Sequence, residues 1–281
     1  MKVGVGLPNT IPLMDGPVAV EWARRAERGP FSSLGVLDRV PYDSFDPFVT
    51  LAAAAAATNR ITLVTMVVIG PLRGSVLLAK QAASVDSISG GRLVLGLSIG
   101  ARREDYLTAR VDHRIRGRRL SEQLSALRSH WEQEAFVPGT VPRAGAPKLL
   151  VGGLTGEAFG RMARYADGYV HGGGPPRAFA GAASKARAAW TQLGRPGRPA
   201  LWGQGYFALG GGSAGPGADY LRDYYAFTGP FAEKIAAANL TTPQAIMDFV
   251  RGYEEAGCDE LVLLPTVPSI EQVDRLAEVV G

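Results

Sequence analysis

Nearly continuous apolar runs alternate with amphipathic stretches along most of the chain. Apolar residues in 78–88 recur with the period of a helix, and Gly90-Gly91 predicts its end because glycine adopts positive φ without steric cost. Residues 93–97 are almost entirely apolar, which is typical of a strand buried on both faces in a parallel sheet. The small residues 98–101 then either let a ligand approach the backbone or simply form a tight turn.

The same alternation continues to the C-terminus and predicts eight strands separated by helices. The predicted strands are Lys2–Leu7, Leu34–Leu37, Ile61–Ile69, 93–97, Leu149–Val151, Gly168–His171, Leu201–Leu209 and Glu260–Leu264. The predicted helices are Val18–Arg28, Asp46–Thr58, 78–88, Ile115–Glu134, Gly156–Ala166, Ala178–Leu193, 218–226, 231–238, 243–256 and Ile270–Val280. Residues 137–147 predict a Pro/Gly connector, and residues 210–217 predict a flexible loop.

Regular alternation of this kind favours a parallel sheet with right-handed crossovers. Eight units in 281 residues fit one (β/α)8 barrel domain spanning residues 1–281, because such barrels have roughly 250 residues. A doubly wound open sheet is the alternative. The glycine fingerprint of a dinucleotide-binding domain does not follow the first strand, which counts against that alternative.

Composition places the chain among globular intracellular proteins. Hydrophobic residues make up 46% of it, and Cys258 is the one cysteine, so no disulfide can form within the chain. The first residues lack a secretory or transit pattern, and no apolar run approaches the roughly 20 residues of a membrane helix. We therefore expect a cytoplasmic protein that does not associate with membranes.

The formal net charge is +4, and arginine supplies most of the positive charge. The most basic stretch, residues 110–120, lacks interleaved aromatic residues and matches no nucleic-acid-binding motif. We interpret it as a solvated helix start rather than a nucleic-acid site, with an anionic cofactor tail as a second possibility.

Several segments, in order, resemble the bacterial-luciferase-like superfamily of flavin- or deazaflavin-dependent oxidoreductases. They are LAKQAASVDSISGGRLVLGLSIG, EDYLTARVDHRIRGRRLSEQLSALRSHW, KLLVGGLTGEAFGRMARYADGYVHGGG and TPQAIMDFVRGYEEAGCDELVLLP. Each segment alone is a modest signal, but their common order is specific, and the resemblance covers essentially residues 1–281.

The resemblance implies a TIM-type barrel that forms a homodimer and binds reduced FMN or coenzyme F-420 at the carboxyl ends of its strands. It also implies a non-proline cis peptide near Val67-Val68, behind the cofactor ring. The chain departs from the family in two respects. The segment after the long helix is short, so we expect short segments covering the site, and Asp38-Arg39 stands where some deazaflavin members carry Asp-His.

By the same resemblance, Asp38 lies near the cofactor ring and is a candidate catalytic residue. Val67 and Val68 lie behind the ring, and Ser98 and Ile99 lie below the ring or the ribityl chain. Asp38, Ser98 and Ile99 also have purely structural interpretations. Asp38 can be a turn carboxylate that accepts from local backbone, and Ser98 and Ile99 can simply begin a loop.

Gly152-Gly153 and Gly172-Gly173 each follow a predicted strand and precede a helix, where free N–H groups and the helix dipole favour phosphate. We expect both pairs to bind the cofactor phosphate, although each can be a plain turn. His171 is a tentative second catalytic residue that contacts phosphate or substrate, or else a structural histidine. The sequence predicts no metal site and no nucleophile–base pair, so the cofactor would carry the chemistry.

Three functions remain open. The first is hydride transfer from reduced coenzyme F-420 to an organic small molecule, and the second is an FMN-dependent luciferase-like monooxygenase. The third is a non-catalytic flavin-binding barrel. We favour F-420 because the arginines of GARRED and RIRGRR would suit its anionic glutamyl groups, and because hydride transfer tolerates short covering segments.

Overall fold

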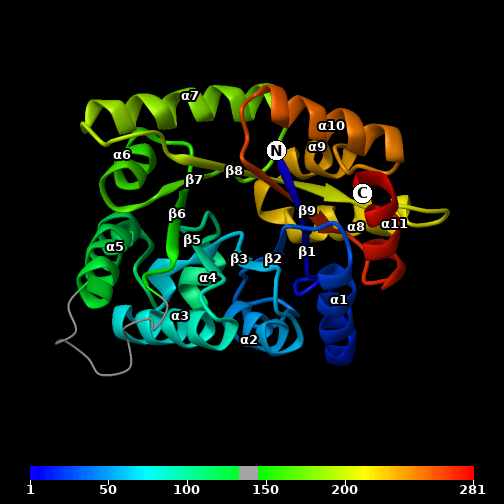
Figure 1. Ribbon diagram of the computed structural model, residues 1–281, viewed down its shortest axis with the longest axis horizontal. Coiled ribbons are helices and arrows are strands. Elements are labelled where there is room, and N and C mark those ends of the chain that lie inside the picture. Colours follow the sequence, from blue (N-terminus) through cyan, green and yellow to red (C-terminus); the bar gives the residue numbers. More distant parts are fainter. Residues whose placement is uncertain (133–144) are drawn as a thin grey trace.

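The computed structural model describes residues 1–132 and 145–281, and its strands form one parallel sheet that closes on itself. Figure 1 shows these strands at the centre with the helices around them. The strands are β1 (Lys2–Gly6), β2 (Ser33–Val36), β3 (Thr62–Thr65), β4 (Val68–Ile69), β5 (Leu93–Ser98), β6 (Lys148–Gly152), β7 (Gly168–Val170), β8 (Ala200–Phe207) and β9 (Glu260–Pro265).

The strand order is β3-β2-β1-β9-β8-β7-β6-β5-β4, and β3 also pairs with β5, which closes the barrel. Since β3 and β4 both pair with β5 in parallel, they are two parts of a single barrel strand. The described residues therefore form the eight-stranded parallel barrel that the sequence predicts, and the open-sheet alternative is wrong.

The helices are close to their predicted positions. They are α1 (Gly16–Arg28), α2 (Pro47–Ala57), α3 (Ser75–Ser89), α4 (Arg103–Thr108), α5 (Arg116–Glu132), α6 (Gly156–Tyr165), α7 (Pro176–Gln192), α8 (Ala214–Tyr224), α9 (Phe231–Ala237), α10 (Pro243–Glu255) and α11 (Glu271–Val280), with 3₁₀ turns η1 (Gly70–Leu72), η2 (His113–Ile115) and η3 (Ala226–Thr228). Residues 133 and 134 of the predicted long helix, and most of the predicted connector 137–147, lie outside the described residues.

Two hydrophobic clusters hold the barrel together, and successive strand residues alternate between them. The outer cluster lies between the strands and the helices and includes Leu63, Leu95 and Tyr169. The inner cluster fills the barrel and includes Val64 and Val170. Both strand faces are apolar because both are buried, which explains the continuous apolar runs.

The predicted strand Ile61–Ile69 is interrupted. The Met66-Val67 peptide bond between β3 and β4 is cis, which confirms the predicted non-proline cis bond one peptide earlier than expected. Thr65 bridges the interruption, since its Oγ1 donates to the Gly96 carbonyl and accepts from the Gly96 N–H, both at 2.8 Å.

Residues 210–217 were predicted as a flexible loop, but α8 already begins at Ala214. Gly217 serves close packing there rather than flexibility. A Cβ at this position would lie 2.4 Å from Thr266 Oγ1 and 2.8 Å from Asn239 Nδ2. Within the described part of the chain, none of the helices has the length and hydropathy needed to cross a bilayer.

Candidate functional site

The predicted site residues follow one another along the carboxyl ends of adjacent strands. Ile69 at the end of β4 pairs with Ser98 of β5, and Gly152 of β6 pairs with Val170 of β7. A Cβ on Gly152 would lie 3.6 Å from the Ser98 Cβ, so these two ends are also in contact. The structure thus brings the predicted residues of β2 to β7 onto one continuous rim, the position at which barrel enzymes place their sites.

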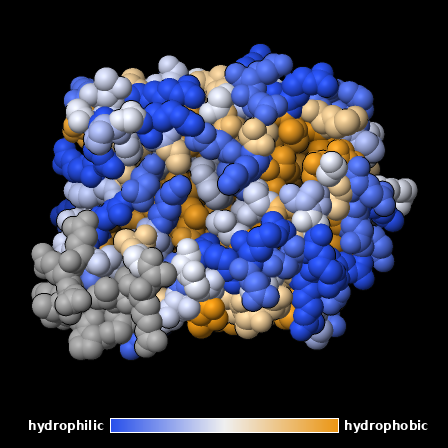
Figure 2. Space-filling model, in the orientation of Figure 1, coloured by the Kyte–Doolittle hydropathy of each residue, from blue (hydrophilic) through white to orange (hydrophobic). Residues whose placement is uncertain are grey.

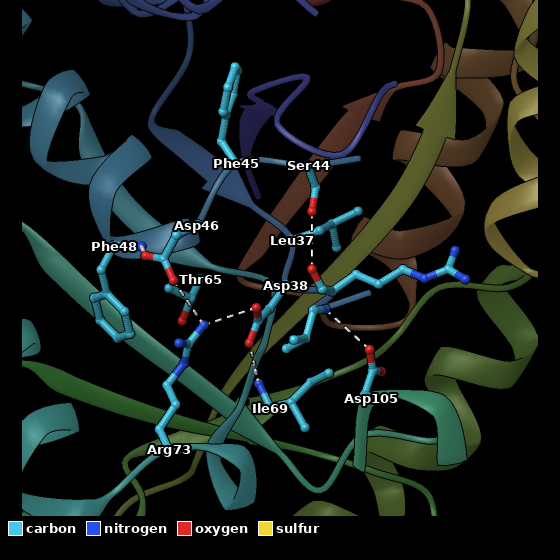
Figure 3. Close-up of polar contacts among 12 residues, drawn as sticks. Leu37, Asp38, Ser44, Phe45, Asp46, Phe48, Thr65, Ile69, Arg73 and Asp105 are labelled. Carbon is cyan, nitrogen blue, oxygen red and sulfur yellow. Dashed lines mark hydrogen bonds and ion pairs between the residues drawn. The ribbon is translucent and has the colours of Figure 1, made fainter. Parts of the chain in front are cut away.

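Asp38 lies at one end of this rim and is held by protein groups on both oxygens (Figure 3). Its Oδ2 accepts from the Ile69 N–H at 2.9 Å, and its Oδ1 accepts from Arg73 Nη2 at 3.0 Å. Arg73 also pairs with Asp46, at 3.2 Å, and Asp46 caps α2 by accepting from the Phe48 N–H. Asp38 therefore ties β2 to the end of β4.

The side chain of Asp38 is only 3% exposed. Burial raises the pKa of the Asp38 carboxyl above its ordinary value, while the Arg73 guanidinium and the Ile69 N–H act in the opposite direction. Asp38 accepts a hydrogen bond from backbone, but the donor is Ile69, 31 residues away, and not the local turn that the structural interpretation names. Its contact with a cofactor ring and its catalytic role stay predictions.

Val67 and Val68 point to different layers. Val68 is buried in the outer cluster, whereas Val67 is half-buried and packs against the inner cluster. Only the Val67 side chain can therefore face the barrel mouth. Ser98 and Ile99 are half-buried, and the Ile99 carbonyl accepts from the Tyr106 hydroxyl.

Tyr220, Leu221 and Tyr224 of α8 pack on the inner cluster at the barrel mouth, so the segment between β8 and β9 covers the mouth and the expectation of short covering segments is wrong. Tyr224, at the end of α8, is 2% exposed and lies between two guanidinium groups. The Arg39 Cζ is 5.2 Å and the Arg102 Cζ 4.5 Å from its ring centroid. Arg39 Nη1 also donates to the Tyr224 carbonyl at 3.1 Å, and the Tyr220 and Thr10 hydroxyls are 2.8 Å apart.

Sequence reasoning missed this arrangement. Arg102 is one of the GARRED arginines that the sequence suggests for the cofactor site, and Arg39 directly follows Asp38, so both positions near the rim follow from the sequence. Nothing local in the sequence pairs them with Tyr224, because α8 comes more than a hundred residues later in the chain.

The first glycine pair follows β6 and precedes α6, whose N-cap Thr155 accepts from the Ala158 N–H. Gly153 has φ +129°, and a Cβ there would lie 2.7 Å from the Ala158 Cβ. Only glycine fits this turn without a shift of α6. The close approach of bare backbone to a helix N-terminus fits an anionic group such as phosphate.

The second glycine pair lies in the loop between β7 and α7, which is fixed through its carbonyl groups. The Gly172 carbonyl accepts from Gln204 Nε2 at 3.2 Å, and the Gly174 carbonyl accepts from the Tyr253 hydroxyl at 2.9 Å. In a trans peptide the carbonyl and the next N–H point in opposite directions, so the Gly173 N–H points away from Gln204. The Gln204 Oε1 is buried and has no hydrogen-bond partner within the described residues.

His171 is not in the barrel interior. Like Tyr169 it faces the helix layer, where its ring lies 5.8 Å from that of Phe179. The side chain is 2% exposed, and Nδ1 lies 3.2 Å from the Tyr169 hydroxyl. A neutral imidazole whose Nδ1 accepts a hydrogen bond from this hydroxyl carries its own proton at Nε2. Nε2 has no partner within the described residues and lies 3.9 Å from where a Gly174 Cβ would be.

His171 is thus placed to donate toward the glycine loop rather than to face a substrate inside the barrel. Within residues 1–132 and 145–281, neither the Gly173 N–H nor the His171 Nε2 has a hydrogen-bond acceptor, and a phosphate oxygen could accept a hydrogen bond from each of them. The residues present therefore fit a phosphate-bearing cofactor, although binding by the two glycine pairs stays a prediction.

We expect His171 to make the stability of the protein depend on pH. Burial lowers the pKa of His171, so the unfolded chain takes up this proton at a higher pH than the folded chain. The stability that the neutral His171 provides is complete above the pKa of about 6.5 that histidine has in the unfolded chain. It is lost as the pH falls below this value. Urea unfolding at about pH 7.5 and about pH 5.5 should show a smaller loss in a His171→Gln variant than in the wild type. Equal losses would contradict this assignment.

A cavity of about 650 Å³ opens beside the second glycine loop. It lies between the N-terminus of α7, the end of β8, α9 and α10. Its lining consists of Gly172, Gly173, Gly174, Pro175, Pro176, Arg177, Gly205, Tyr206, Tyr225, Phe231, Lys234, Ile235, Ala238 and Phe249. Figure 2 shows hydrophobic residues at several places on this face of the molecule, among them around α9 and α10.

No group of three or more His, Cys, Asp or Glu side chains in residues 1–132 and 145–281 could hold a metal ion. The ionisable residues along the rim are mainly Asp38, Arg39, Arg73 and Arg102, each engaged with protein partners.

The chain is similar to a known protein family and to individual proteins. A family model described as luciferase-like monooxygenase matches residues 1–257. An uncharacterized protein of Mycobacterium tuberculosis is 32% identical over 187 residues, which are 55% of this chain and 65% of that protein. The match therefore spans slightly less than two thirds of this relative.

Two solved structures share the whole fold at low identity. An F-420-dependent secondary alcohol dehydrogenase, in complex with an F-420–acetone adduct, has a TM-score of 0.82 and 16% identity, covering 99% of this chain and 98% of that one. The oxygenating constituent of 3,6-diketocamphane monooxygenase from Pseudomonas putida, in complex with FMN, has a TM-score of 0.74 and 14% identity, covering 100% and 98%.

Proposed function

This chain belongs to the luciferase-like monooxygenase family, and we propose that it is an oxidoreductase that uses reduced coenzyme F-420 to transfer a hydride to a small organic substrate. The observation that carries this proposal is the continuous rim, with Asp38 and Val67 at one end and the two glycine loops at the other. A cofactor with a flat ring and a phosphate matches the two ends of such a rim.

Each part of the rim has a distinct task in this proposal. Val67 and Ser98 would flank the ring, and Gly152, Gly153, Gly172 and Gly173 would hold the phosphate. Asp38 and Arg73 keep the ends of β2 and β4 together, and α8 shields the mouth from water. When bound, reduced F-420 supplies the hydride, while the protein supplies binding and orientation.

The choice of F-420 over FMN is supported by the similarity to the F-420-dependent alcohol dehydrogenase, which has the higher TM-score of the two solved structures. The argument from short covering segments no longer supports it, because α8 lies over the mouth. A homodimer, a small-molecule substrate and a cytoplasmic location complete the proposal.

We expect the purified protein to bind F-420 more tightly than FMN. We also expect it to oxidise reduced F-420 anaerobically in the presence of a ketone, with acetone as the first probe because it is present in the related complex. Fluorescence titration measures binding, and the absorbance of oxidised F-420 measures turnover. Activity seen solely with reduced FMN and oxygen would favour the monooxygenase. Binding without any turnover over a panel of ketones and aldehydes would favour the non-catalytic barrel.

A further inference from the structure

The cavity begins where the rim ends. Gly172 and Gly173 belong both to the predicted phosphate loop and to the cavity lining. Along the ladders from β4 through β5, β6 and β7 to β8, the cavity at β7 and β8 comes directly after the phosphate loops. On the other side of the closed barrel, β9 and β1 separate β8 from β2 and Asp38. A cofactor laid along the rim with its ring beside Asp38 reaches this cavity with the part that follows its phosphate. FMN ends at its phosphate, whereas F-420 continues with anionic glutamyl groups.

Two cations that form no ion pair within the described residues lie at the edge of this cavity, although the Lys234 Nζ is 6.0 Å from the centroid of the Phe231 ring. Arg177 is the second residue of α7, and Lys234 lies on α9. Glu233, next to Lys234, is already held by Arg222 at 3.0 Å. Both cations are exposed and free to pair with a ligand carboxylate.

The arginines that the sequence suggested for this role are mostly engaged elsewhere. Arg102 pairs with Asp105 at 3.4 Å and lies over Tyr224, and Arg116 donates to the His113 carbonyl at 2.8 Å. Arg102 and Arg116, in the segments after β5, are therefore less available to a ligand carboxylate than Arg177 on α7 and Lys234 on α9.

The wall of the cavity suits a chain whose charges are separated by apolar groups. Phe231, Ile235 and Phe249 supply apolar contacts, and the Tyr206 and Tyr225 hydroxyls, 2.6 Å apart, satisfy each other. The α7 N-terminus adds a partial positive charge near Arg177. Methylene and amide segments can lie on this wall while carboxylates reach the edge.

We propose that this cavity receives the carboxylate-bearing extension of coenzyme F-420, and that Arg177 and Lys234 select F-420 over FMN. This inference rests on the proposed function, since it takes the rim as the site of the ring and the phosphate. It names residues that determine cofactor specificity without taking part in the reaction.

The test is fluorescence titration of Arg177→Glu, Lys234→Glu and the double variant with oxidised F-420 and with FMN, at about 0.15 M salt so that long-range effects are screened. The double variant should bind F-420 about tenfold more weakly, because two favourable charge contacts become repulsive. Its FMN affinity should change less than about threefold. Glu is well tolerated in the first turn of a helix, so α7 should remain folded.

Lys185→Glu is the matched control, because Lys185 lies on α7, is exposed and is not part of the cavity lining. It should change neither affinity. Equal loss of F-420 and FMN, or unchanged F-420 affinity in the double variant, would overturn the inference while the proposed function stands. Failure of the wild type to bind either cofactor would instead overturn the proposed function, and this inference with it.

Discussion

Gly153→Asp is expected to weaken the binding of F-420 by about a hundredfold, which corresponds to about 2.7 kcal/mol. Three effects act in the same direction. The backbone at φ +129° strains any side chain, and a Cβ would lie 2.7 Å from the Ala158 Cβ. The new carboxylate would also occupy the N-terminal end of α6 itself and repel the phosphate that we expect there.

Fluorescence titration measures this loss, and thermal unfolding shows whether the variant still folds. Gly153→Ala separates the steric effect from the charge and should lose less affinity than Gly153→Asp. Gly160→Ala is the control on the same helix, because a Cβ there meets no atom within 4 Å. It should keep its affinity and gain up to about 1 kcal/mol of stability. Unchanged affinity in a folded Gly153→Asp variant would place the phosphate elsewhere.

The barrel was predictable because its signals are local. The end of α3 is an example. Gly90 adopts φ +70°, and Gly91 N–H donates to the Asp86 carbonyl at 2.8 Å, so the glycine pair ends the helix as its sequence predicts. The apolar run that follows becomes β5 because strands covered on both sides have no polar face. Repeated eight times, this pattern fixes the architecture.

The cover of the mouth was not predictable, because it depends on contacts between distant parts of the chain. The hydrogen bond from Arg39 to Tyr224 joins residues 185 positions apart. Glycines at 210–217 suggested flexibility, but Gly217 is required by close packing against Thr266 and Asn239. A glycine in the sequence shows that a side chain is absent, but not whether the position is free to move or is packed against other residues.

The face of β7 on which His171 lies was not predictable, for a different reason. In a strand with two buried faces, alternation tells which residues share a face but not which face is inside. His171 shares its face with Tyr169, and the structure shows that this face meets the helices. The cofactor role of Asp38 is likewise open, because a buried carboxylate that binds neighbouring protein groups looks the same in sequence as one that binds a ligand.

Asp38→Ala is expected to lower the free energy of unfolding by about 3 kcal/mol in the absence of cofactor. The substitution leaves the Ile69 N–H without its acceptor and removes the nearer of the two carboxylates that pair with Arg73. Removing one partner from a buried ion pair is costly because the other charge stays buried. Asp46 keeps Arg73 partly paired, so the loss should be at the lower end of the usual range of about 3–5 kcal/mol.

Two further variants make this prediction specific, and urea unfolding measures all three. Asp38→Asn retains an acceptor for the Ile69 N–H and loses only the charge, so its cost should be about half that of Asp38→Ala. Asp43→Ala is the control, because the Asp43 carboxylate also accepts one backbone N–H, that of Leu13, but does so at the surface. Its cost should stay below about 1 kcal/mol. If Asp38→Ala destabilised the protein no more than Asp43→Ala, the carboxylate of Asp38 would not be needed to join β2 to β4. The carboxylate would then be available to a bound cofactor, although its contacts with the Ile69 N–H and Arg73 favour the structural role.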